Sequence, residues 1–318
     1  MFLALTATCQ WYGATLLRVT PKMSMRIGAR FVDVHQNAKA AGLVLAGGRS
    51  TRMGAPKASL EWHGSTLLHR AAALLGRVVD GPVVVVAAPG QSLPELPSAA
   101  EVVEDPVEGL GPMRGIATGL AAVADRASAA FVCSTDMPFL HPAFVSRVLR
   151  EFAAADTDVV LPTARGFRQP LAAVYGTSLA GLIADLASEG ELRPGMLFEH
   201  CRVTGIDDQQ LLADSVLARF DPDLESVMNL NSPDEYEAAR ARPPAEVAVQ
   251  CFGALATAGH RGPRTVRAAT LGAAAEAVDV PLDQYVMAAL NGDLMTRDPH
   301  LPLVAGDTVA LLSADAGG

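Results

Sequence analysis

A glycine-rich segment that carries three cationic side chains is the first candidate for chemistry. Residues 45–57 read LAGGRSTRMGAPK and continue from the apolar run at residues 42–46. Glycines let backbone N–H groups approach phosphate oxygens closely, and Arg52 and Lys57 supply positive charge for a triphosphate. A tight turn without a ligand would also use glycines, but cations directly after an apolar strand favour phosphate binding. The segment has neither a GK[ST] ending nor a GxGxxG pattern, so it is not a Walker A loop.

An aspartate at the end of another apolar run is the second candidate. Asp136 follows the run at residues 130–133 and is held by Pro138. Mg²⁺ prefers one or two carboxylates together with substrate phosphates and water, so Asp136 is predicted to be a magnesium ligand. The alternative is that Asp136 caps a helix that starts near His141.

A second aspartate gives the third candidate. Asp105 follows the short apolar run at residues 101–103, and the segment 105–115 reads DPVEGLGPMRG. Its glycines precede a predicted helix whose N-terminal amides would face an anion. The order of glycine loop, Asp105 and Asp136, each at the end of a predicted strand, points to one shared site.

The elements that must position these residues alternate between apolar runs and helical periodicity. Strands are predicted at residues 42–46, 83–86, 101–103, 130–133 and 158–161. Helices are predicted between them: one from an N-cap at Ser65, one through residues 116–123 and one through residues 144–152. This alternation predicts an α/β fold with a mostly parallel, Rossmann-like sheet, in which ligands bind beyond the carboxyl ends of the strands.

A separate unit is predicted at the C-terminal end. Residues 242–245 (RPPA) read as a linker between a domain at residues 39–241 and one at residues 246–318. The second domain shows strands at residues 246–252, 264–267, 286–290 and 308–312 and a helix at residues 271–278. This β-β-α-β-β order is compatible with a β-grasp. Residues 1–38 lack the basic start of a signal peptide and are expected to be a disordered leader or a non-native start.

Composition excludes several classes of protein. The formal charge is −9, and an acidic balance argues against nucleic acid as a partner while allowing a small nucleotide substrate. The four cysteines are far apart and form no CxxC pair, which favours a reducing cytoplasm over a zinc site or a disulfide scaffold. No apolar run reaches the roughly 18–20 residues of a membrane helix, so no membrane partner is expected.

Five segments in this order resemble the molybdenum cofactor guanylyltransferase (MobA) family. They are LAGGRSTRMGAPK (45–57), DPVEGLGPMRGI (105–116), STDMPFL (134–140), RQPLAAVY (168–175) and NLNSPDEY (229–236). The resemblance covers residues 41–240 and implies the nucleotide-diphosphosugar-transferase-like fold of the nucleotidyltransferases. It also implies that the phosphate of molybdopterin attacks the α-phosphate of GTP, that pyrophosphate leaves and that Mg²⁺ is required.

The resemblance implies a role for each residue that matches a motif position. These are Leu45, Ala46, Gly47 and Gly48 at the guanine nucleotide, Lys57 and Arg52 at the phosphates as catalytic cations, Asp105 at the nucleotide, Asp136 at Mg²⁺ as a catalytic residue, and Asn229 and Asn231 on the pterin side.

Two departures leave the base open. Pro56 stands where these guanylyltransferases usually have Asp, and a Pro before the Lys also occurs in the molybdopterin cytidylyltransferases. A polar residue often found after the second strand is replaced by residues 87–89 (AAP). The Gly47-Gly48 pair favours guanine, so GTP is preferred over CTP. A sugar-phosphate nucleotidyltransferase and a non-catalytic carrier or scaffold are the other readings.

The C-terminal domain resembles the small sulfur carrier of molybdopterin synthase (MoaD) and its ThiS relatives. The resemblance rests on residues 289–293 (ALNGD), residues 303–312 (LVAGDTVALL) and the pair Gly317-Gly318. It implies a thiocarboxylate at Gly318, with the large subunit of molybdopterin synthase and its adenylating enzyme as partners. Residues 313–315 replace the usual prolines before the tail, so a domain that only docks is the alternative.

Overall fold

The computed structural model of the chain describes residues 39–47, 56–106, 111–191, 193–256 and 262–313. The predicted leader at residues 1–38, residues 48–55 of the glycine loop and the Gly-Gly terminus lie outside these residues. The described residues belong to one compact unit and contain two separate larger sheets. Within them, no helix combines the length and apolar character needed to cross a bilayer.

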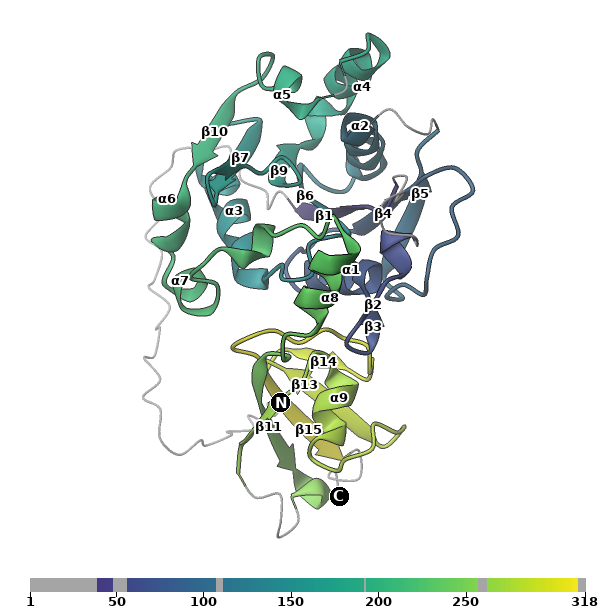
Figure 1. Ribbon diagram of the computed structural model, residues 1–318, viewed down its shortest axis with the longest axis vertical. Coiled ribbons are helices and arrows are strands. Elements are labelled where there is room, and N and C mark those ends of the chain that lie inside the picture. Colours follow the sequence, from purple (N-terminus) through teal and green to yellow (C-terminus); the bar gives the residue numbers. More distant parts are fainter. Residues whose placement is uncertain (1–38, 48–55, 107–110, 192, 257–261, 314–318) are drawn as a thin grey trace, which may run out of the picture. The chain divides into compact units, whose positions relative to one another are not determined.

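The described part of residues 39–241 forms strands and helices in alternation (Figure 1). The strands are β1 (Ala40–Leu45), β2 (Glu61–Trp62), β3 (Ser65–Thr66), β4 (Val83–Ala87), β5 (Ala100–Glu104), β6 (Ala129–Ser134), β7 (Val159–Ala164), β8 (Phe167–Arg168), β9 (Ala172–Gly176) and β10 (Val203–Ile206). The α-helices are α1 (Leu67–Gly76), α2 (Gly111–Val123), α3 (Pro142–Ala154), α4 (Ala180–Ser188), α5 (Pro194–Leu197), α6 (Asp208–Leu212), α7 (Ser215–Phe220) and α8 (Pro233–Arg240).

The large sheet has the strand order β10-β7-β9-β6-β1-β4-β5, with β8 paired to β7. Strands β5, β4, β1 and β6 are parallel neighbours, and β9 runs antiparallel between β6 and β7. The predicted mostly parallel α/β sheet is therefore confirmed, apart from the antiparallel β9. Strands β1, β4 and most of β6 are buried along their length, which explains why their sequences are continuous apolar runs.

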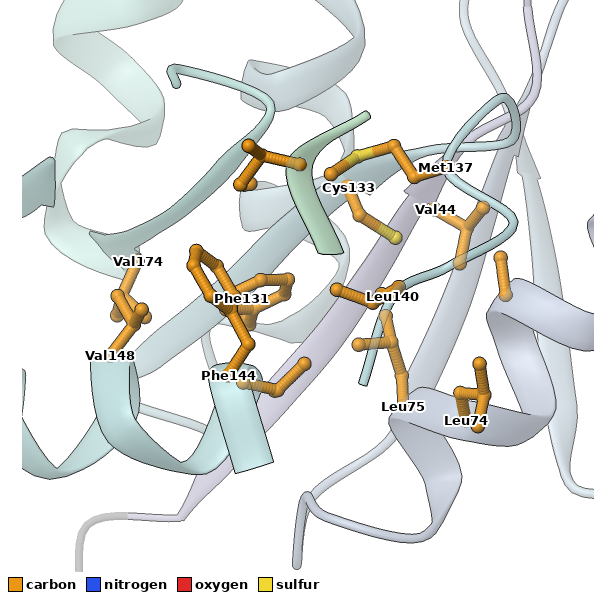
Figure 2. Packing of buried hydrophobic residues seen from close by; sticks show 14 of the residues in the cluster. Val44, Leu74, Leu75, Phe131, Cys133, Met137, Leu140, Phe144, Val148 and Val174 are labelled. Carbon is orange, nitrogen blue, oxygen red and sulfur yellow. The ribbon is translucent and has the colours of Figure 1, made fainter. Parts of the chain in front are cut away.

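Helices cover both faces of this sheet (Figure 1). Helices α2 and α4 pack on one face, where Ile116, Leu120 and Ile183 belong to one core cluster. Helices α1 and α3 pack on the other face, where the cluster includes Leu75 and Phe144 (Figure 2). Two hydrophobic cores thus hold the sheet rigid and leave its strand ends to present polar residues.

The start of α3 removes one alternative left by the sequence. His141 is the N-cap, and its Nδ1 accepts a hydrogen bond of 3.0 Å from the backbone N–H of Ala143, while Pro142 occupies the first turn. Asp136 lies five residues before this cap. The hypothesis that Asp136 caps the helix is therefore wrong.

The predicted N-cap of α1 is also displaced. Ser65 belongs to the hairpin of β2 and β3, where it pairs with Trp62. The two turn residues between them, His63 and Gly64, both have positive φ. The next residue, Thr66, caps α1 by accepting from the backbone N–H of His69. The prediction missed the hairpin because two-residue strands leave almost no periodic pattern.

A second, five-stranded sheet follows the residues predicted as the linker. Its elements are β11 (Glu246–Phe252), β12 (Arg264–Arg267), α9 (Leu271–Glu276), β13 (Val286–Leu290), β14 (Leu294–Thr296) and β15 (Thr308–Ser313). The order is β12-β11-β15-β13-β14, with β11 parallel to β15 and the other pairs antiparallel.

Strand β14 is absent from the sequence prediction. It forms because Asn291 and Gly292 both adopt positive φ and reverse the chain after β13, which is the usual use of an Asn-Gly pair in a hairpin. The buried residues of this sheet and of α9 form a core cluster of their own that includes Val249, Leu271 and Leu311.

Residues 302–307, called the docking segment here, join the second sheet to the large α/β region. Asp307 accepts hydrogen bonds of 2.5 and 3.0 Å from the guanidinium of Arg77, which directly follows α1. The carbonyl of Ala305 lies 3.0 Å from Nε2 of His141. Gly306 has positive φ, and a Cβ on it would overlap the ring of Phe220. The contact therefore combines a buried ion pair with a close approach that only glycine allows.

Candidate active site

The carboxyl ends of four parallel strands bring the predicted site residues to one edge of the large sheet. Leu45, the last residue of β1, is in register with Ser134 of β6 and with Val86 of β4. Ala87 of β4 is in register with Glu104, the last residue of β5. The chain therefore leaves β1, β5 and β6 on the same side of the sheet, which is the edge where open α/β sheets bind ligands.

The lysine and the aspartate from two of the predicted segments are in direct contact. Nζ of Lys57 donates to Oδ2 of Asp136 at 2.6 Å, although the residues are 79 positions apart. Lys57 lies in the short 3₁₀ helix Lys57–Ser59, and Asp136 follows β6. Their side chains are 20% and 16% exposed, so the pair is shielded but reachable from solvent. A cation and a carboxylate at this position suit phosphates and a divalent metal.

Asp136 is held by two further contacts. Its Oδ1 accepts a hydrogen bond from the hydroxyl of Ser134, and its backbone carbonyl accepts one of 2.9 Å from the N–H of Leu230. Leu230 is buried, whereas Asn229 and Asn231 on either side of it are exposed. The backbone contact thus places the two predicted pterin-side asparagines beside the aspartate.

Asp105 sits after β5 on the same edge. Its backbone N–H donates to the carbonyl of Ala87 at 2.8 Å, which fixes it to the end of β4. Its carboxylate is 3.7 Å from Nε of Arg114, a residue in the first part of α2. Arg114 lies in a segment that was singled out, but its role beside Asp105 did not follow from the sequence.

A glutamine that the sequence prediction missed connects the loops after β1 and β4. The side-chain Oε1 of Gln91 accepts from the N–H of Ala88 at 2.9 Å, and its Nε2 donates to the carbonyl of Ala46 at 3.0 Å. Gly47 lies close to the same loop, because a Cβ on it would be 3.4 Å from the nitrogen of Ala88. A polar residue soon after the apolar run of β4 was the available clue.

The first residues of the glycine loop are placed by the backbone. Leu45 and Ala46 are buried and Gly47 is exposed, and the N–H groups of Ala46 and Gly47 both donate to the carbonyl of Val86. The predicted residues Gly48 and Arg52 lie outside the described residues, as does Gly318, the predicted sulfur-carrier terminus.

The donor set at this edge fits a hard cation held partly by its substrate. The structure offers no cluster of three or more His, Cys, Asp or Glu side chains suited to a metal, as far as its described residues go. Carboxylates at Asp136 and Asp105 on one edge match the one or two carboxylates by which Mg²⁺ joins substrate phosphates. Cys133 does not belong to this set: burial raises the pKa of its thiol, and Asp136 raises it further, so the thiol stays protonated.

Comparison with known proteins places the α/β region in a family. The family described as "MobA-like NTP transferase domain" matches residues 42–203. A probable molybdenum cofactor guanylyltransferase of Mycobacterium tuberculosis (strain H37Rv) is 42% identical over 162 residues, which are 50% of this chain and 79% of the relative. The corresponding protein of Mycobacterium avium (strain 104) is 40% identical over 153 residues, 47% of this chain and 76% of the relative.

A solved structure agrees with the fold. Molybdopterin-guanine dinucleotide biosynthesis protein A from Archaeoglobus fulgidus superimposes with a TM-score of 0.51 and 22% sequence identity. The alignment covers 63% of this chain and 96% of that protein. At this identity the match supports the fold alone.

Proposed function

The chain belongs to the MobA-like NTP transferase family, and from this premise we propose that it transfers GMP from GTP to molybdopterin, with pyrophosphate as the second product. That it is a nucleotidyltransferase follows from the family and from relatives named molybdenum cofactor guanylyltransferase. Those names favour GTP as the donor and molybdopterin as the acceptor. The observation that carries the proposal is the 2.6 Å contact of Lys57 with Asp136 at the carboxyl edge.

The proposed reaction is a displacement at phosphorus. A phosphate oxygen of molybdopterin forms a bond to the α-phosphorus of GTP while the bond from that phosphorus to the β-phosphate oxygen breaks, and pyrophosphate leaves. Negative charge accumulates on the leaving oxygen. Mg²⁺ held by Asp136 would supply charge stabilisation there, and Lys57 would add a second positive charge without forming a covalent intermediate.

The structure suggests how the charge of Lys57 is balanced before the substrate binds. In the present arrangement its charge is balanced by Asp136, so neither partner is left unpaired. With a triphosphate and its metal at the edge, Asp136 would hold the metal and Lys57 would bind the phosphates. Both side chains are partly exposed, so the desolvation free energy that this exchange of partners costs is small.

The other residues take supporting roles in the proposal. Leu45, Ala46 and Gly47 contact the nucleotide, with Gly48 and Arg52 continuing the loop. Asp105, oriented by Arg114, contacts the nucleotide. Asn229 and Asn231 face the acceptor, and their position beside Asp136 supports an acceptor close to the metal.

The test is the choice of nucleotide with molybdopterin as acceptor. Pyrophosphate release is measured with Mg²⁺ and molybdopterin in the presence of either GTP or CTP. The measurement is repeated with a sugar phosphate in place of molybdopterin. Dinucleotide formed from GTP supports the proposal, and turnover with CTP alone would assign the chain to the cytidylyltransferases suggested by Pro56. Turnover of sugar phosphates in preference to molybdopterin would contradict the acceptor.

For the C-terminal region we propose a β-grasp domain with a sulfur-carrier function. The support is its strand order, in which the first and last strands are parallel neighbours at the centre of the mixed sheet and α9 lies between the second and third strands. The proposed partners are the large subunit of molybdopterin synthase and its adenylating enzyme, which would act on Gly318 in a reducing cytoplasm.

The carrier role is tested by the intact mass of the chain after co-expression with the adenylating and sulfur-transfer enzymes. A thiocarboxylate adds the mass difference between one sulfur and one oxygen, and Gly318→Ala is the control that should lose it. An unchanged mass in the parent chain would leave the region with a docking function only.

A further inference from the structure

A cavity of about 230 Å³ lies between α1, the loop that follows Asp136 and the C-terminal region. Its lining comes from both parts of the compact unit: Trp62, Phe139 and Phe220 on the α/β side and Leu303 and Val304 on the other. Aromatic and aliphatic side chains thus form part of the walls, and charged and polar side chains form the rest. The volume is below the range of about 300–1,000 Å³ usual for drug-sized ligands, so a nucleoside triphosphate would not fit.

One cation in this cavity has unused donors. Arg70 of α1 is 8% exposed, and its Nε donates to the carbonyl of Pro138 at 2.8 Å. Its two terminal amino groups have no hydrogen-bond partner among the described residues, although the side chain lines the cavity. A guanidinium has five N–H donors, so four of them remain available.

Three further polar residues of the cavity have hydrogen-bond partners of their own. Glu225 accepts two hydrogen bonds from Arg242, at 3.1 and 2.6 Å. The carboxylate of Asp221 accepts the backbone N–H groups of Glu225 and Ser226. His141 uses both ring nitrogens, one at Ala143 and one at Ala305. Asp221 and Glu225 are therefore engaged with other groups and form no ion pair with Arg70.

Arg70 stays charged despite its burial. Burial, together with the neighbouring Arg77, lowers the pKa of Arg70 to about 10, and Asp307 opposes the shift. At neutral pH the group is still protonated. A largely buried cation that has a single protein hydrogen bond and no ion pair is stabilised when an anion binds to it.

We propose that this cavity binds a small organic oxyanion, with its phosphate or carboxylate on the terminal amino groups of Arg70 and its apolar body against the aromatic walls. The planar fork of Arg matches both oxyanions in a bidentate manner. Trp62 and Phe139, whose rings are 5.6 Å apart edge to face, would contact the body of the ligand. The site is distinct from the edge that holds Lys57 and does not depend on the proposed acceptor.

The test is calorimetric titration of the full chain with phenyl phosphate, benzoate and, as the uncharged analogue, benzyl alcohol. One equivalent of phenyl phosphate or benzoate is expected to bind, and the tighter of the two identifies the preferred oxyanion. Arg70→Met should weaken this binding at least about tenfold, the loss of charge-assisted hydrogen bonds. Binding of benzyl alcohol as tight as that of the anions would overturn the proposal, and so would no binding at all.

Two further variants keep the test decisive. Ala245→Leu reduces the cavity from a partly exposed position and leaves the Arg70 side chain in the protein, so it should also abolish binding, even if Arg70→Met does not fold. Lys57→Met removes the phosphate-binding cation of the sheet edge and should leave binding intact. Loss of binding in Lys57→Met together with full binding in Ala245→Leu would place the anion at the sheet edge and refute the cavity site.

Discussion

Two ion pairs in this molecule have the same chemistry and opposite settings. Lys57 and Asp136 meet at 2.6 Å at the carboxyl edge, and Arg77 and Asp307 meet at 2.5 Å at the docking segment. The side chains of the first pair are 20% and 16% exposed, and those of the second are 7% and 4% exposed. Asp307 also accepts from the side chain of Asn291 and from the N–H of Val304.

The difference shows how environment assigns a role to a pair. The carboxylate of Asp307 is saturated with donors and sealed, so exchanging a partner would leave a buried charge. Asp136 has one lysine and one hydroxyl as partners and remains reachable. The arrangement of Arg77 and Asp307 suits a fixed structural contact, and that of Lys57 and Asp136 suits a site whose partners change when a ligand binds.

The largest effect is expected from breaking the sealed pair. Arg77→Met leaves Asp307 buried without its cation and should lower the free energy of unfolding by about 3–5 kcal/mol. Urea denaturation measures the loss. The control is Arg267→Met, whose partner Glu246 is 60% exposed and whose loss should cost at most about 1 kcal/mol. Equal losses in the two variants would mean that burial does not distinguish the docking pair.

The pair of Lys57 and Asp136 should show the reverse behaviour. Asp136→Asn keeps the shape of the side chain and removes its charge, so kcat is expected to fall by about 10²–10³-fold while the urea midpoint changes little. Asp125→Asn, at an 80% exposed surface position, is the matched control and should retain full turnover. A stability loss in Asp136→Asn as large as that in Arg77→Met would make the edge pair structural.

A smaller effect on activity is expected when the Gln91 side chain, which connects the loops after β1 and β4, is replaced. Gln91→Leu removes two hydrogen bonds that fix Ala46 and Ala88, so the backbone that is proposed to contact the nucleotide should become less ordered. The KM for the nucleotide should rise about tenfold, with kcat changed less. Steady-state kinetics separate the two constants, and a fall in kcat alone would assign Gln91 to the chemical step instead.

The smallest effect is a pH dependence of the docking contact. Burial lowers the pKa of His141, and the Ala305 carbonyl only partly opposes this. Because the folded pKa lies below the unfolded value of 6.5, folding stability is complete above pH 6.5 and decreases as the pH falls towards the folded pKa. The loss is at most about 1.4 kcal/mol per pH unit. Urea midpoints at pH 7.5 and 5.5, compared between the parent chain and His141→Asn, measure it; an identical slope in both would contradict the assignment.

The sequence predicted the parts of the fold that local patterns encode. Buried strands such as β4 are continuous apolar runs, and parallel strands deliver the residues after them to one edge, so the placement of Asp105 and Asp136 on that edge followed from strand order alone. The antiparallel β9 lay within a motif that resemblance identified, but its direction depends on its neighbours in the sheet and not on its own residues.

Contacts between distant positions were not predictable from one sequence. Lys57 and Asp136 are separated by 79 positions and Arg77 and Asp307 by 230, and no periodicity links either pair. Arg70 reads as an ordinary surface cation of a helix until the carbonyl of Pro138 and the cavity are seen. Strand β14 was missed because three residues after a turn carry too little pattern, although the Asn-Gly pair was an available sign.

The hydrogen bond from Leu230 to the carbonyl of Asp136 has a consequence for any redesign of this enzyme. One hydrogen-bonded peptide group connects Asp136, the proposed metal ligand, to the segment that carries Asn229 and Asn231. A substitution that reshapes this segment to admit a new acceptor is therefore expected to shift the carboxylate of Asp136 as well. If the proposed roles of these residues hold, acceptor choice and metal affinity should change together.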